Sequence, residues 1–153
     1  MKLLIITLAL SGLLSPVAKA GDLPDPILTP GVTRNIDVNT LCTTHTKAVR
    51  LTTPAMKALV YKKYGITPRH APECTGPSHS CYEIDHKYAL EDAGADDVKN
   101  LWPQLYDGNW NAHMKDKLEN LVHKKICAGA LTIAEGQKLL DNWTYSYTLY
   151  FTH

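Results

Sequence analysis

The sequence predicts an α+β fold for an exported chain that disulfides cross-link. Three observations predict this class: apolar residues at helical spacing in two long segments, two short apolar runs that indicate strands, and four cysteines that follow an export signal. The chain has 153 residues, and the part after the signal is long enough for one domain with a single modest core.

Residues 1–20 contain the three parts of a secretory signal peptide. A basic start at Met1-Lys2 precedes an apolar run over 3–14, and Ala18-Lys19-Ala20 is a small-x-small cleavage site. The apolar run is too short for a permanent membrane span, which needs about 20 apolar residues. We therefore expect the mature protein, residues 21–153, to be exported to the periplasm or the medium, without stable membrane insertion.

Export makes disulfides the expected state of the four cysteines, for which three pairings are open. Cys74 and Cys81 are close in the chain and stand in a segment rich in proline and glycine, so a local bridge is one expectation. Cys42 with Cys127 would then join the N-terminal segment to the end of a later helix.

A competing interpretation of the same region is a structural zinc knuckle, because thiolate and imidazole are the ligands that structural zinc prefers. Disulfides are favoured over it, because thiols in an exported protein are usually oxidised. The four ligands would be Cys74, His79, Cys81 and His86.

Local signals place the first elements. Residues 21–36 contain three prolines and predict an extended N-terminal arm ahead of a single domain over 37–153. A short helix is expected over 37–46, and Thr53-Pro54 begins a second helix that Gly65 ends.

The middle of the chain predicts two strands joined by a connector. A loop over 66–80 leads to a strand over 81–84, and a glycine-containing connector over 90–99 leads to a second strand over 101–104.

Helices and a final strand are expected in the last third of the chain. The longest helix should span 111–128, and a capping box begins another helix that runs from Thr132 to about residue 141. Aromatic and apolar residues alternate with small polar ones over 143–151, which predicts a strand.

A polar pair at the end of the first strand, Asp85-His86, is the main candidate for chemistry. Metal-assisted hydrolysis of a phosphodiester needs a base that deprotonates water, a cation, and groups that position both. The long helix carries polar residues at successive i, i+4 steps, so they form one stripe, and its N-terminal end can reach the strand. The stripe consists of Asn111, Lys115, Glu119 and His123.

These residues resemble a known family. Asp85-His86, the connector 93–97 and Asn100-Leu101 resemble the first two parts of the HNH motif. A longer string is similar to small exported bacterial HNH-like proteins over most of the mature chain: Tyr82, Asn100-Leu101-Trp102-Pro103-Gln104, Asn111-Ala112, Lys115-Asp116, Leu118-Glu119-Asn120 and His123.

The resemblance implies a ββα-metal (HNH, or His-Me finger) core with additional helices. In such a core His86 would be the base that activates water and Asp85 a metal ligand. Asn100 would hold the turn and orient His86. Lys115 would contact phosphate, although it could equally pair with Glu119 one helical turn away.

The third position of the motif leaves a choice of metal ligand on the helix. Asn111 fits the helix start best, and Asn109, His113 and His123 are alternatives. Oxygen ligands at this position favour Mg²⁺ over zinc, with Mn²⁺ and Zn²⁺ as further options.

The expected function is therefore an exported, monomeric, metal-dependent endonuclease that hydrolyses DNA, with RNA as a second substrate. No immunity or partner protein can be identified from the chain. The alternative is a non-catalytic HNH-like binding protein. Charge favours this alternative somewhat, because without Lys2 and Lys19 the 16 basic residues become 14 against 15 acidic ones.

Overall fold

Two antiparallel strands, β1 (Tyr82–His86) and β2 (Leu101–Leu105), form a two-stranded sheet at the centre of the molecule. The computed structural model describes residues 21–152, so the predicted signal peptide lies outside the described residues. In the ladder Tyr82 pairs with Leu105 and His86 with Leu101. Against the prediction, β1 starts one residue later and ends two residues later, and β2 ends one residue later.

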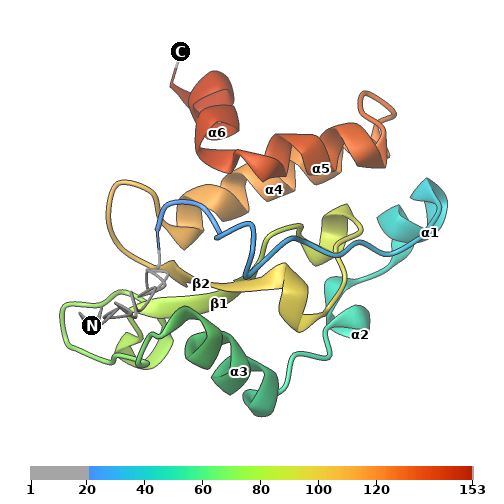
Figure 1. Cartoon of the computed structure of the whole chain (residues 1–153). Coiled ribbons are helices and arrows are strands. Elements are labelled where there is room, and N and C mark those ends of the chain that lie inside the picture. The colour runs from blue at the N-terminus through green and yellow to red at the C-terminus, as the bar shows by residue number, and fades with distance from the viewer. Residues whose placement is uncertain (1–20, 153) are drawn as a thin grey trace, which may run out of the picture.

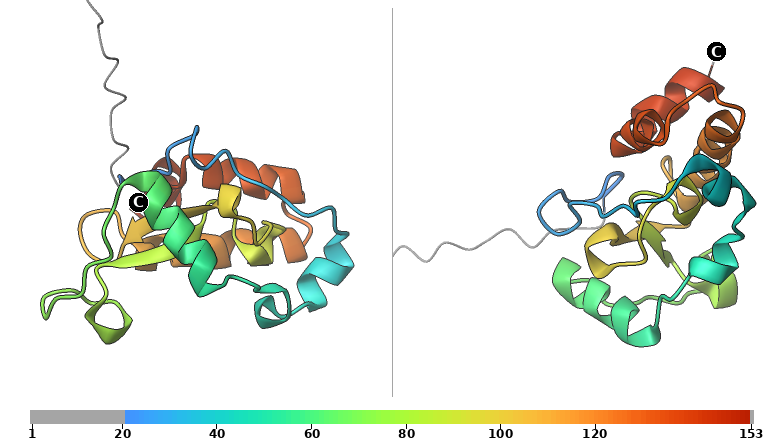
Figure 2. Two further views of the ribbon diagram at one scale, coloured as in Figure 1. Left: turned by 60° about the horizontal axis from the view of Figure 1, so that its bottom comes forward. Right: turned by 90° about the vertical axis from the view of Figure 1, so that its right-hand side faces the viewer.

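Helices cover both sides of this sheet (Figure 1). The helix α3 (Pro54–Tyr64) packs against β2 on one side, and α4 (Ala112–Cys127) lies on the other. The helices α5 (Ile133–Asp141) and α6 (Trp143–Phe151) cover the outer side of α4, as both views of Figure 2 show. The chain is thus α+β, as predicted.

Short elements complete the fold. The helix α1 (Val38–Thr43) packs on α4, and α2 (Thr46–Val49) packs beside the connector between the strands. Three single turns of 3₁₀ helix are η1 (Pro77–His79), η2 (Leu90–Asp92) and η3 (Val98–Asn100). The last two lie in the connector, which the sequence predicted as a turn region.

The predicted ends of α3 and the predicted start of α5 are confirmed, because each is made by residues close to one another in the chain, whereas the helix expected over 37–46 ends at Thr43. Thr53 accepts a hydrogen bond from Met56 N at the start of α3, and Gly65 ends that helix at φ 63°, where glycine is favoured. The capping box of Thr132 and Glu135 begins α5.

The strand predicted over 143–151 is wrong, because these residues form α6. The same residues also fit a helical pattern, because Trp143, Tyr147 and Phe151 stand at i, i+4 spacing. Trp110 packs edge-on against Trp143 and Tyr147, with ring centroids 5.7 and 6.1 Å apart. Burial of this helical face against α4 and its N-terminal loop therefore decides the conformation.

Two disulfides cross-link the fold. Cys42 is joined to Cys127, which ties α1 to the end of α4, and Cys74 is joined to Cys81. The zinc-knuckle interpretation is wrong, because the cysteines it needs are oxidised and no cysteine is free. The two disulfides fit an oxidising, exported environment.

The N-terminal arm is extended, and it is bonded along the connector and α3. Thr29 is fully buried and its hydroxyl donates to the Leu101 carbonyl oxygen at 2.9 Å. The Arg34 guanidinium donates to the carbonyl oxygens of Leu90 and Gly94 in the connector. Among residues 21–152 there is no helix of the length and hydropathy that a membrane crossing requires.

Candidate functional site

A cavity of about 150 Å³ opens where β1 ends beside α4. Asp85 and His86 both line it, although neighbouring residues of a strand point to opposite faces. Its wall is strongly acidic, with Arg50 as the cation at its rim. The acidic side chains are those of Glu83, Asp85, Glu91, Asp116 and Glu119.

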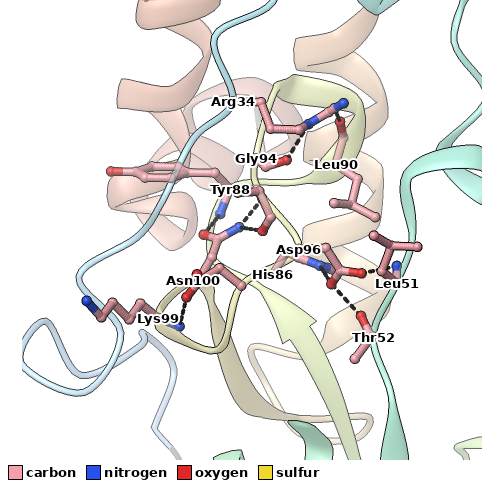
Figure 3. A network of polar contacts seen from close by, with 12 residues as sticks. Arg34, Leu51, Thr52, His86, Tyr88, Leu90, Gly94, Asp96, Lys99 and Asn100 are labelled. Atoms are coloured by element: carbon pink, nitrogen blue, oxygen red, sulfur yellow. Dashed lines mark hydrogen bonds and ion pairs between the residues drawn. The ribbon is translucent and has the colours of Figure 1, made fainter.

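His86 is held by Asp96 from the connector (Figure 3). His86 Nε2 lies 2.9 Å from Asp96 Oδ1, and the imidazole is only 3% exposed. Asp96 also accepts hydrogen bonds from the Thr52 hydroxyl at 2.5 Å and from the backbone N–H of Leu51. Three groups from two segments, the connector and residues 51–52, therefore fix the orientation of this imidazole.

The protonation of this pair follows from its surroundings. Burial raises the pKa of Asp96, but the hydrogen bonds from Thr52, His86 and Leu51 outweigh it and hold that pKa below its ordinary value. Burial also lowers the pKa of His86, against the opposing effect of Asp85 and Asp96. At neutral pH the imidazole is neutral. Since an ionised carboxylate only accepts, Nε2 carries the proton and Nδ1 keeps a free electron pair.

Asn100 acts on the connector and makes no direct hydrogen bond to His86. Its amide donates to the carbonyl oxygens of Tyr88 and Ala95 at 3.0 and 2.8 Å, and its oxygen accepts from the Tyr88 N–H at 3.0 Å (Figure 3). The side chain thus closes the turn, whereas the contact that orients His86 comes from Asp96.

Lys115 is the residue of α4 that faces Asp85. Its ammonium is 1% exposed and donates to Asp85 Oδ2 at 2.6 Å, to the His86 carbonyl oxygen at 2.7 Å, and to Glu119 Oε1. Burial lowers the pKa of Lys115, but the carboxylates of Asp85 and Glu119 outweigh it and raise that pKa above its ordinary value. Lys115 is therefore a buried cation bonded to the protein, and its pairing with Glu119, the alternative to a phosphate contact, is confirmed.

The predicted helix ligand, Asn111, does not reach Asp85. It is the N-cap of α4, where its side chain accepts from Met114 N and donates to the Gly108 carbonyl oxygen. The alternatives Asn109 and His113 are exposed, outside the cavity.

His123, the last alternative, also lies elsewhere. Its Nδ1 is 2.7 Å from the carbonyl oxygen of Glu91, and its Nε2 faces Cys127 Sγ. Of the four polar residues on this face, Lys115 bonds to Asp85 and Glu119 bonds to Lys115.

The residues at this position do not fit the predicted divalent ion. Asp85 accepts a hydrogen bond from Lys115, and Asn111, the predicted ligand on the helix, is the N-cap of α4. Within residues 21–152 no group of three or more His, Cys, Asp or Glu side chains is arranged to hold a metal ion.

Glu83 is a second titratable group of the cavity. Burial, with the carboxylates of Asp85 and Asp116, raises the pKa of Glu83 to about 7. Lys115 and Tyr106 oppose this rise in the pKa of Glu83. The site therefore combines a neutral imidazole with a carboxyl group that is partly protonated at neutral pH.

A larger cavity of about 410 Å³ adjoins the first and shares Arg50 and Glu83 with it. Half of the residues that line this cavity have a cationic or an aromatic side chain. They are Arg50, Lys57, His70, Tyr61, Tyr82 and Tyr106. Such a lining suits an extended anion that carries flat rings.

Sequence reasoning missed Glu83, Asp96 and Arg50. A signal existed for Glu83, because it stands two residues before Asp85 in a strand and must share its face. Asp96 and Arg50 had no such signal, since they reach the site from a connector and from the end of α2.

Comparison of the chain with protein-family models, with curated proteins and with solved structures gives no match in any of the three.

Proposed function

We propose that the protein is an exported hydrolase of phosphodiester bonds, with DNA as the first substrate and RNA as the second, and with His86 as the general base. The observation that carries the proposal is the buried pair of His86 and Asp96 in the wall of a cavity. An imidazole held by an ionised carboxylate is the arrangement of an oriented base. The periplasm or the medium is the proposed location.

The chemistry assigned to the site needs a base and an acid. Nδ1 of His86 takes a proton from water, and the water oxygen attacks phosphorus. The bond from phosphorus to the leaving oxygen breaks, and the carboxyl group of Glu83 gives that oxygen its proton. The pKa of His86 is lowered and that of Glu83 is raised, and such opposite shifts in one cavity are typical of a paired base and acid.

The larger cavity supplies the binding surface in this proposal. Arg50 stands where the two cavities meet and would neutralise the phosphate under attack. Tyr61 and Tyr82 would stack on bases of the neighbouring nucleotides. A single strand or a locally opened duplex suits these positions better than intact duplex DNA.

A nicking assay tests the proposal. Protein of residues 21–153 is incubated with supercoiled plasmid, with single-stranded DNA and with RNA, each with Mg²⁺ or Mn²⁺ and with EDTA. We expect cleavage by the wild type and by His113→Ala, whose histidine is exposed outside both cavities, and none by His86→Ala. Equal cleavage by His86→Ala, or no cleavage by the wild type under any condition, contradicts the proposal.

The second candidate is a non-catalytic protein that binds nucleic acid. The acidic wall of the smaller cavity favours it, because carboxylates repel phosphate from the vicinity of His86. In the same assay this candidate predicts that single-stranded DNA is bound in the larger cavity and recovered intact.

A further inference from the structure

We infer that Lys115 is the built-in cation of the site, and that its ammonium takes the place at Asp85 that a divalent ion would otherwise hold. The inference concerns cation binding only and does not depend on whether the protein cleaves nucleic acid.

The first step is the arrangement of oxygens around the ammonium. Asp85 on β1, Glu119 on α4 and the carbonyl group of His86 each direct an oxygen at Lys115 Nζ. Two of the distances are 2.6 and 2.7 Å, close to the range of about 2.3–2.6 Å found for calcium and oxygen. Two carboxylates and one carbonyl oxygen are also the ligand types that hard cations prefer.

The second step is burial. Lys115 is 1% exposed, and the side chains of Asp85 and Glu119 are only 13% and 10% exposed. A carboxylate at this depth needs a compensating charge, because an unpaired buried charge is strongly destabilising. Lys115 is part of α4, so it supplies that charge permanently, whatever the concentration of metal ions.

The third step is exclusion. An ion bound by the same three oxygens would occupy the position of Lys115 Nζ, and two cations cannot occupy one position. The remaining carboxylates of the cavity are not grouped for an ion, since residues 21–152 contain no arrangement of three or more suitable side chains. The wild type is therefore expected to bind no divalent ion through Asp85.

Two substitutions separate charge from volume. Lys115→Ala removes the ammonium and opens its space, so three oxygens become available to an ion. Lys115→Met removes the charge but fills the space with an apolar chain of similar length. The double variant Asp85→Asn with Lys115→Ala lacks one of the two carboxylates.

The experiment measures thermal unfolding in EDTA, in Ca²⁺ and in Mn²⁺, together with Mn²⁺ binding by equilibrium dialysis. For the wild type we expect one melting temperature in all three conditions, and the same Mn²⁺ binding as for Asp85→Asn. Lys115→Ala should melt several degrees lower in EDTA and regain most of the loss in Ca²⁺ or Mn²⁺, because a ligand that binds only the folded state stabilises it. Lys115→Met and the double variant should regain nothing.

Several results would overturn the inference. The first is Mn²⁺ bound by the wild type and lost in Asp85→Asn. The second is a Lys115→Ala variant that gains no stability from either ion, or gains no more than Lys115→Met. If Lys115→Ala folds only when an ion is present, the inference is supported, and if it folds under neither condition, an ion cannot replace the ammonium and the inference fails.

Discussion

His86 Nε2 lies 2.9 Å from Asp96 Oδ1, with side chains that are 3% and 5% exposed. Asp96 is in turn held by Thr52 and by the backbone of Leu51, from the segment between α2 and α3. The orientation of the imidazole therefore depends, through the Asp96 carboxylate, on residues 51 and 52, which are far from His86 in sequence.

Asp96→Asn should lower the rate of phosphodiester cleavage by about 10²-fold or more, within the range that a well-placed general base contributes. The amide no longer compels Nε2 to carry the proton, so the other tautomer becomes populated and Nδ1 loses its free electron pair. Initial rates on plasmid measure the effect. Asp107→Asn, which removes a carboxylate bonded to Thr75 outside both cavities, is the matched control and should cleave like the wild type.

The pH dependence of cleavage should be bell-shaped and narrow. His86 acts when neutral, and because burial lowers its pKa below the ordinary 6.5, activity rises with pH at values more acidic than 6.5. Glu83 acts when protonated, so activity falls as pH rises through its pKa of about 7. In Glu83→Gln the decline above neutral pH should disappear from the profile of kcat/KM. A profile of unchanged shape in that variant would remove Glu83 from the acid role.

Arg50→Ala and Lys57→Ala should each raise KM several-fold, since both cations line the larger cavity. Loss of one phosphate contact should also reduce the salt dependence of binding, with a change of about 1 in the slope of log K against log salt. Lys117→Ala removes an exposed cation of α4 that lines neither cavity, and its KM and salt slope should match the wild type.

The two disulfides should differ in what they contribute to stability. Cys42 and Cys127 are 85 residues apart and Cys74 and Cys81 only 7. On the chain-entropy model, replacing the first pair by serine costs about 4–5 kcal/mol of unfolding free energy and replacing the second about 2–3 kcal/mol. Urea unfolding of the two double variants measures both values. An equal loss would mean that loop closure does not determine the contribution.

Asp92 should make stability depend on pH. It is fully buried, its two oxygens have no hydrogen-bond partner among the described residues, and burial raises its pKa to about 8. Between its ordinary value of 3.8 and about 8 the folded state holds the proton that the unfolded state has lost. This group therefore destabilises the fold progressively as pH rises through that window, by at most about 1.4 kcal/mol per pH unit.

Asp92→Asn should remove this dependence. The variant should gain stability over the wild type at pH 8 and gain little at pH 4, when unfolding free energies at both values are compared. The same gain at both pH values would show that the effect comes from packing and not from the proton.

Local elements of this fold were predictable because their causes are local. Thr53, Thr132 and Asn111 each cap a helix through residues three positions further along the chain, and the pattern of short apolar runs was sufficient for both strands. Residues 143–151 were predicted wrongly because their spacing fits a strand and a helix equally, and burial against α4 and Trp110 distinguishes the two.

By itself the sequence determined the α+β class, the limits of α3, α4 and α5, and the presence of an acid and an imidazole at the end of β1. Only the tertiary structure decided what those two groups meet: His86 meets Asp96 from the connector, and Asp85 meets Lys115 and not Asn111. Asn111 and Lys115 stand four residues apart on one stripe, so sequence spacing could not choose between them. The choice depends on how far α4 is displaced along β1, and long-range packing sets that displacement.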